Sequence, residues 1–185
     1  MLRSELVTQE NFEEAVKLQN EIFPRENARA FLLKAVSDIS DHKTPEKYKL
    51  TYYLVRDKNN KAVGIWGHYI VDSKNELWLG WYGVHPQERL KGYGTEIFEF
   101  FESYAKLNGF CVLRLYTDEV DNAAACKLYE KMGMVKEYYE NPNDMTKDVG
   151  RIVIYSKALT REKLMPWNNK FINYKGQNEK LIKRG

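Results

Sequence analysis

A basic loop that contains two glycines lies in the middle of the chain, between an apolar segment and a long amphipathic one. The apolar segment, residues 77–84, is rich enough in aromatic and branched side chains to form a buried strand. After the loop, Ile97, Phe98 and Phe101 recur at helical spacing. The loop, residues 85–95, therefore joins the end of a strand to the start of a helix.

This position favours the binding of a diphosphate. The first N–H groups of a helix lack intrahelical partners, and the helix dipole adds partial positive charge there. Gly92 and Gly94 leave the main chain open to a ligand and permit positive φ, while Arg89 and Lys91 add charge at the rim. A rim charge contributes about 0.3–1 kcal/mol, against about 1.5–3 kcal/mol for each hydrogen bond to a charged group. We therefore expect main-chain donors to dominate.

Two common phosphate-binding motifs do not fit the loop. The dinucleotide fingerprint requires a third glycine where Ile97 stands, and the P-loop requires Gly-Lys-Ser/Thr where residues 94–96 read Gly-Thr-Glu. Residues 89–94, Arg-Leu-Lys-Gly-Tyr-Gly, instead match Arg/Gln-x-x-Gly-x-Gly/Ala at every fixed position. In this they resemble the acyl-CoA-binding signature of the GNAT superfamily of N-acetyltransferases.

A second stretch extends the resemblance. Residues 122–134, Asn-Ala-Ala-Ala-Cys-Lys-Leu-Tyr-Glu-Lys-Met-Gly-Met, are similar to the family's Asn-x-x-Ala-x-x-Leu-Tyr-Glu-Lys-x-Gly-Phe element. Met134 replaces the usual aromatic residue. The matched stretches run from about Leu77 to about Tyr139, and the rest of the chain agrees with the family in pattern only.

The predicted elements give an α+β fold with a mixed, mostly antiparallel seven-stranded sheet flanked by four helices, in agreement with a GNAT-like fold. The turn at residues 58–61 predicts a hairpin, and the strand-helix-strand unit around the loop predicts two parallel strands. The helices are expected to include residues 12–22, 31–39, 95–108 and 123–132. The strands are expected at residues 2–7, 49–57, 62–71, 76–84, 110–117, 134–140 and 151–157.

Composition limits the class of protein. A length of 185 residues with 43% hydrophobic and 14% aromatic content indicates a folded domain. The net charge of +3 is too balanced to indicate nucleic-acid binding, and no apolar run approaches a membrane span. Nothing at the N-terminus resembles a secretory signal, so we expect a cytoplasmic protein that binds neither nucleic acid nor a membrane.

The C-terminus differs from the rest of the chain. From Arg161 to Gly185 there are seven basic and two acidic residues, so residues 160–185 are interpreted as a basic extension docked on an acetyltransferase domain of residues 1–159. The two cysteines, Cys111 and Cys126, fall within predicted elements without metal-ligand spacing. We interpret them as small buried thiols and expect no metal site.

The resemblance implies acetyl-CoA as cosubstrate and maps a general acid onto Tyr129, seven residues after Asn122 on one helix. A packed helix aromatic would equally explain Tyr129, and a helix cap would explain Asn122. The resemblance also implies that the main chain near residues 82–84 polarises the thioester carbonyl. The residues expected to bind the cofactor are Tyr82, Gly83, Val84, Arg89, Leu90, Lys91, Gly92, Tyr93, Gly94, Thr95 and Asn122.

No general base follows from the resemblance. One subfamily places a glutamate six residues before the equivalent of Val84, where this chain has Trp78. Glu76 lies on the same predicted strand face, Glu21 lies near the end of the first helix, and His68 lies on the preceding strand. Glu76 and Glu21 are the candidate catalytic carboxylates, although each is more often a solvated residue. Without a placed carboxylate, we expect an amine of low pKa or a water chain.

The acceptor is expected to be a primary amine of a small molecule or peptide. Family precedent assigns the acceptor side to residues 20–41 and 141–150, and assembly as a homodimer stays open. The alternative hypothesis is a non-catalytic acyl-CoA-binding sensor or interaction module. The carboxylates that fit a cationic amine are Glu21, Glu26, Asp38, Asp41 and Asp144, and the aromatic residues that fit a wall are Trp66, Tyr69, Trp78, Trp81 and Tyr82.

Overall fold

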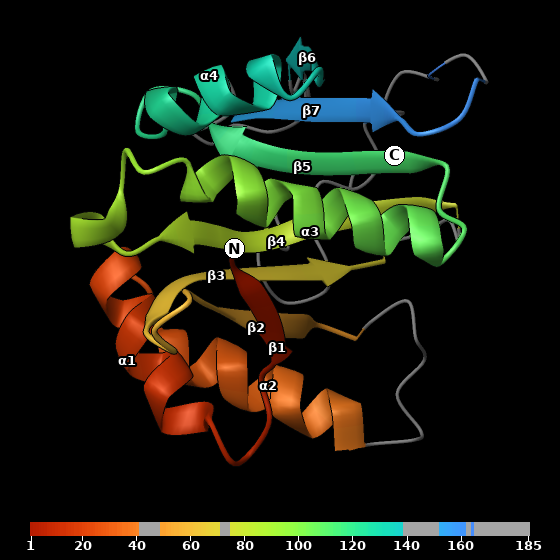
Figure 1. The fold of residues 1–185 in the computed structure, drawn as a ribbon. Helices are drawn as coiled ribbons and strands as arrows, with labels where there is room; N and C mark the ends of the chain where they lie inside the picture. Colours follow the sequence, from red (N-terminus) through yellow and green to blue (C-terminus); the bar gives the residue numbers. More distant parts are fainter. Residues whose placement is uncertain (41–48, 71–74, 139–151, 162–163, 165–185) are drawn as a thin grey trace, which may run out of the picture. The chain divides into compact units, whose positions relative to one another are not determined.

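Seven strands form one sheet in a computed structural model of the chain, with the order β1-β2-β3-β4-β5-β7-β6 (Figure 1). The structure describes residues 1–40, 49–70, 75–138, 152–161 and 164. Four α-helices accompany the sheet within these residues, which confirms the predicted fold class. None of the helices in these ranges is long and apolar enough to cross a membrane.

The chain divides into two compact units, and strand β4 contributes to both. Unit 1 comprises Met1–Tyr69 and Leu79–Tyr104, and unit 2 comprises the described residues of Ile70–Trp78 and Ala105–Gly185. Most of the predicted extension, residues 160–185, lies outside the described residues. The proposed boundary at residue 159 therefore stays a prediction.

Unit 1 begins with an antiparallel meander. β1 pairs with β2, with Arg3 opposite Arg56, and β2 pairs with β3, with Tyr53 opposite Trp66. The turn at residues 58–61 connects β2 to β3, which confirms the predicted hairpin. The elements of unit 1 are β1 (Arg3–Leu6), α1 (Phe12–Ile22), α2 (Ala28–Ser40), β2 (Thr51–Arg56), β3 (Ala62–Tyr69), most of β4 (Glu76–Val84), the short 3-10 helix η2 (Pro86–Glu88) and α3 (Tyr93–Leu107).

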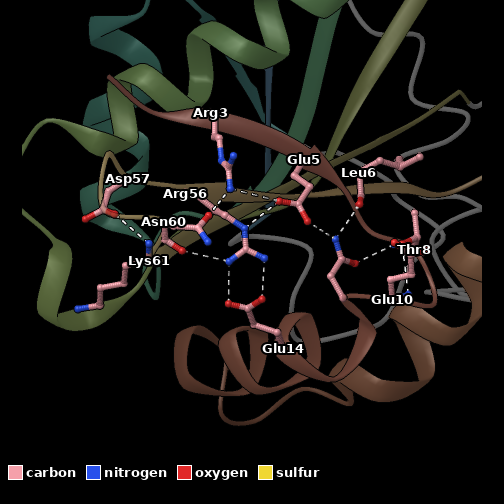
Figure 2. A network of polar contacts seen from close by, with 11 residues as sticks. Arg3, Glu5, Leu6, Thr8, Glu10, Glu14, Arg56, Asp57, Asn60 and Lys61 are labelled. Carbon is pink, nitrogen blue, oxygen red and sulfur yellow. Dashed lines mark hydrogen bonds and ion pairs between the residues drawn. The ribbon is translucent and has the colours of Figure 1, made fainter.

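A buried arginine fixes helix α1 to the meander. Arg56 is 8% exposed, and Figure 2 shows it between two carboxylates. Its two terminal nitrogens donate to Glu14 of α1 at 2.8 and 2.6 Å, and its Nε donates to Glu5 of β1 at 2.8 Å. These contacts lower the pKa of both carboxyls, because each accepts hydrogen bonds from a cation. The N-terminal half of α1 is therefore held against β1 and β2.

Unit 2 is built on strand β5. The first residues of β4 pair with β5 in parallel, with Glu76 opposite Val112, which confirms the predicted parallel pair. β7 pairs antiparallel with both β5 and β6. Helix α4 lies between β5 and β6 in sequence. The further elements of unit 2 are β5 (Val112–Asp118), α4 (Ala123–Lys131), β6 (Val135–Tyr138) and β7 (Ile152–Ala158).

The expected element boundaries agree with the structure to within about two residues, apart from helix α2, whose start at Ala28 precedes the predicted apolar face. Strand Glu76–Val84 matches at both ends, whereas α3 begins at Tyr93 rather than Thr95. The short helix η2 was not predicted. Its proline stands at the start of the helix, where the missing N–H removes no intrahelical hydrogen bond, so the proline was an available signal. Cys126 is buried as expected, while Cys111 is half-buried.

Candidate active site

The glycine loop turns between the end of β4 and the start of α3 through two residues with positive φ. Leu90 has φ 64° and Gly92 has φ 85°, values that a residue with a side chain seldom adopts. Apart from Gly92 itself and its chain neighbours, no atom of the described residues lies within 4 Å of the position that a Cβ on Gly92 would take. The main chain at Gly92 is therefore open on the side where a side chain would stand.

The loop and the first turn of α3 present main-chain donors. The first hydrogen bonds of the helix run from the N–H groups of Thr95 and Glu96 to the carbonyl oxygen of Gly92, at 3.0 and 3.3 Å. The N–H groups of residues 91–94 donate to no carbonyl within the described ranges. The Tyr82 hydroxyl donates to the Gly94 carbonyl oxygen at 2.6 Å and so ties the helix start to β4. A diphosphate fits this arrangement, since it accepts several such bonds at once.

A buried carboxylate organises two lysines beside the loop. Glu88 accepts hydrogen bonds from Lys61 Nζ and Lys91 Nζ, each at 2.6 Å. These bonds lower the pKa of the Glu88 carboxyl to about 2. Lys91 belongs to the predicted motif, but Lys61 comes from the turn between β2 and β3, and only the folded structure brings it to the loop. Sequence reasoning missed both Lys61 and Glu88.

The end of β4 packs closely against the end of α1. A Cβ on Gly83 would lie 2.5 Å from Ile22 Cγ2 and 3.0 Å from Phe23 Cζ, so a close approach requires glycine at this position. On the same strand, the Trp81 ring packs against Phe23 at 4.8 Å and Phe31 at 5.5 Å between ring centroids. The end of β4 is therefore held against the end of α1.

The two predicted catalytic carboxylates have different partners. Glu21, the penultimate residue of α1, lies with Oε2 3.2 Å from His85 Nε2, and its side chain is 42% exposed. Glu76 accepts a hydrogen bond from Arg114 at 2.9 Å in unit 2. His85, which directly follows β4, was not among the predicted catalytic residues. Only its place in the fold reveals its contact with α1.

His68 is buried and belongs to an aromatic cluster. Its ring stacks on Tyr104 at 4.3 Å, with Tyr53 and Trp66 nearby. Burial lowers the pKa of His68 to about 3, and its Nε2 has no hydrogen-bond partner among the described residues. A ring that stays neutral down to this pH binds protons too weakly to serve as a general base near neutrality.

Tyr129 lies buried on α4 in unit 2. Its ring packs against Tyr155 at 5.4 Å, and burial raises the pKa of its hydroxyl. The phenol therefore stays protonated at neutral pH, which is the form that a proton donor needs. Asn122 occupies the N-cap position of α4, but its side chain makes no capping hydrogen bond. Side-chain capping therefore does not account for Asn122.

The predicted site residues are divided between the two units. Residues 82–84 and 89–95 lie together in unit 1 with Glu21, whereas Asn122, Tyr129 and Glu76 belong to unit 2. Among the acceptor-side residues, Asp41 and Asp144 lie outside the described residues. No group of three or more His, Cys, Asp or Glu side chains in the described ranges is arranged to hold a metal ion.

The seven-stranded sheet with its four helices agrees with the GNAT-like fold expected from the sequence. Residues 12–134 match the model of the acetyltransferase (GNAT) family. The chain therefore belongs to the GNAT acetyltransferase family. No curated protein matches the chain in sequence.

Solved structures of other acetyltransferases share this fold. A GNAT-family acetyltransferase from Desulfovibrio desulfuricans superposes with a TM-score of 0.71 at 12% identity, over 86% of this chain and all of that chain (100%). The ribosomal-protein-S18-alanine N-acetyltransferase from Escherichia coli gives 0.62 at 18% identity, over 92% and 99%. A spermidine/spermine N-acetyltransferase from Vibrio cholerae gives 0.63 at 14% identity, over 85% and 95%. Family membership supports acyl-CoA-dependent N-acetyl transfer as the general chemistry.

Proposed function

We propose that the protein transfers an acetyl group from acetyl-CoA to a primary amine by direct attack of the amine on the thioester. The observation that carries this proposal is that the N–H groups of residues 91–94 meet no carbonyl acceptor among the described residues and lie next to the lysines that Glu88 holds. Together they offer main-chain donors and positive charge to a diphosphate. Family membership supports the same cosubstrate.

The binding residues keep the roles expected from the motif. Residues 89–95 are proposed to bind the diphosphate, and Lys61 joins them as a further source of positive charge. The main chain of residues 82–84 is proposed to face the thioester, and Asn122 to bind the arm of the coenzyme. Acetyl-CoA itself supplies the activated acyl group.

Tyr129 is proposed to donate a proton to the departing thiolate. Its raised pKa makes this transfer costly unless the hydroxyl is aligned in advance with the sulfur, because a phenol of ordinary pKa is already a weaker acid than a thiol. Removal of the hydroxyl in Tyr129→Phe should lower kcat about 100-fold or more and leave the Kd for acetyl-CoA unchanged. A tyrosine that only packs against Tyr155 predicts an unchanged kcat.

The acceptor class can be tested with amines of different pKa. An amine with a pKa of about 10.4 costs about 4.6 kcal/mol to deprotonate at neutral pH, against about 1 kcal/mol for an α-amine of pKa about 7.7. Two structural neighbours act on spermidine or spermine and on the alanine of ribosomal protein S18. A release assay for free thiol should therefore compare spermidine, spermine, a lysine peptide and a peptide that begins with alanine.

The cofactor site is tested by Gly94→Glu. The new carboxylate would occupy the space of a phosphate and repel it, so calorimetric binding of acetyl-CoA should disappear. Ser103→Glu adds the same charge to an exposed position on the same helix and should bind normally. Normal affinity in Gly94→Glu would contradict the assignment. Acetyl-CoA binding without thiol release for any amine would instead favour a sensor.

A further inference from the structure

We propose that Glu21 takes the proton that the acceptor amine loses, and that His85 is the positioning residue that holds the Glu21 carboxylate. The proposal rests on the proposed N-acetyltransferase function, and it assigns the base that the sequence left open. It is based on two contacts of His85 and on the position of Glu21 and His85 in unit 1.

The two contacts of His85 fix which ring nitrogen carries the hydrogen. His85 precedes η2, and its Nδ1 accepts a hydrogen bond from the Gln87 N–H at 3.3 Å. A neutral imidazole that accepts at Nδ1 carries its hydrogen on Nε2. That nitrogen lies 3.2 Å from Glu21 Oε2, so the hydrogen-bearing nitrogen is the one in contact with the carboxylate. Each ring nitrogen thus has a polar neighbour.

This assignment separates the roles of the two residues. His85 has no remaining lone pair with which to accept a proton from a substrate, and its side chain is 16% exposed. Glu21 has a second carboxylate oxygen, and its side chain is 42% exposed. The His85 ring lies beside one oxygen of this carboxylate. The carboxylate is therefore the group of the pair that can reach an amine, directly or through one water molecule.

The pair lies at the end of β4, where the thioester is proposed to bind. His85 follows Val84 directly, and its N–H donates to the Val63 carbonyl oxygen at 2.9 Å, which fixes the main chain there. Ile22 and Phe23, which follow Glu21, pack against Gly83. Both members of the pair are thus attached to the segment whose main chain is proposed to polarise the carbonyl.

The proton balance of the reaction requires two proton transfers. The amine arrives as an ammonium ion and loses two protons in total. One of these protons passes to the Glu21 carboxylate and from there to solvent. As the C–N bond forms and the C–S bond breaks, the Tyr129 hydroxyl is proposed to give its proton to the departing thiolate, and the second amine proton then restores that hydroxyl through solvent. The products are an amide, a free thiol and one proton.

The test uses two substitutions of His85 that each keep one of its contacts. In His85→Gln the side-chain amide can take the place of Nε2 and donate to Glu21, while the cap of η2 is lost. In His85→Asn the side-chain oxygen can take the place of Nδ1 and accept from Gln87 N–H, while the donor to Glu21 is lost. Glu21→Gln removes the proton acceptor, and Glu99→Gln changes the same charge at an exposed position of α3.

The expected result is a kcat about 100-fold or more lower in Glu21→Gln, with an unchanged Kd for acetyl-CoA and wild-type kcat in Glu99→Gln. In His85→Asn, kcat should fall at least about tenfold, whereas in His85→Gln it should stay within about threefold of wild type. Both are measured with the amine of the proposed panel that gives the fastest thiol release. The reverse order of the two His85 variants would show that His85 acts only as a helix cap, and would overturn its positioning role.

Two other outcomes are distinguished by the same measurements. A Glu21→Gln variant that keeps its kcat within about threefold, while the wild type releases thiol, would overturn the assigned base and leave the proposed function standing. A wild type that binds acetyl-CoA but releases no thiol with any amine would overturn the proposed function, and the base with it.

Discussion

Glu21 and Glu76 are the same residue type and were both predicted as proton acceptors, yet the fold gives them opposite surroundings. Glu76 accepts from Arg114, whose side chain is 2% exposed and also contacts Ser156 at 2.6 Å and Glu137 at 3.7 Å. Glu21 lies 3.2 Å from the imidazole of His85, and its side chain is open to solvent. A buried guanidinium is always charged and needs its carboxylates, so the charge of Glu76 is committed to the structure of unit 2. The partner of a carboxylate, more than its position in the sequence, separates a structural role from a catalytic one.

The largest effect that this comparison predicts is on the stability of Arg114→Met. Removal of the guanidinium leaves Glu76 and Glu137 without their cation, and breaking a buried pair in this way costs about 3–5 kcal/mol. Urea unfolding should show the loss. The control is Arg29→Met, which removes an exposed pair with Glu13 and should leave the urea midpoint unchanged. Equal midpoints for the two variants would show that Arg114 is not a structural centre.

Glu76→Gln should have the next largest effect. Loss of one charged hydrogen bond to Arg114 should lower the free energy of unfolding by about 1.5–3 kcal/mol. The kcat of the folded enzyme should fall less than in Glu21→Gln. A variant that unfolds like the wild type but loses as much kcat as Glu21→Gln would make Glu76 the base and reverse the comparison.

The same contrast in surroundings applies to His68 and His85, two of the described residues of unit 1, and for His68 it predicts a pH dependence. The pKa of His68 is about 3 in the folded protein because the ring is buried, against about 6.5 in an unfolded chain. Between these values the unfolded chain binds a proton that the folded protein does not bind. Stability should therefore fall as the pH is lowered from about 6.5 towards 3, by up to about 1.4 kcal/mol per pH unit.

His68→Phe keeps an aromatic ring against Tyr104 and removes this titration. Urea unfolding at about pH 7 and about pH 5 should therefore show a smaller loss of stability in the variant than in the wild type. Parallel losses would mean that His68 is protonated in the folded protein.

Lys61→Met should give the smallest effect. Lys61 shares Glu88 with Lys91 at the loop, so its removal takes one positive charge from the edge of the proposed phosphate site. We expect the Kd for acetyl-CoA to rise about two- to fivefold, as for a charge near a helix end. Lys58→Met alters the same turn at an exposed position and should leave the Kd unchanged. Equal affinities in the two variants would remove Lys61 from the site.

Local patterns predicted most of the fold. The strand at residues 76–84, the loop at residues 85–95 and the helix after it are continuous in sequence, so periodicity and motif are enough to identify them. The parallel pairing of β4 with β5 also followed from the order of the elements.

The partners of the candidate site residues were not predictable in the same way. Glu88 meets Lys61, and His85 meets Glu21, only because residues far apart in sequence lie side by side once β3, β4 and α1 have packed. A single sequence places a carboxylate on a helix or a strand, but it does not say which cation the carboxylate will meet. The distinction between Glu21 and Glu76 therefore required the structure.

The attachment of α1 has a consequence for redesign. Arg56 binds helix α1 near its beginning, and Gly83 packs against its end. These contacts fix the axis of α1. They do not involve the exposed positions between α1 and α2. Those exposed positions can be exchanged as a cassette while the scaffold keeps its shape. For the proposed acetyltransferase, a change of acceptor amine would be sought at these positions, with both anchors left untouched.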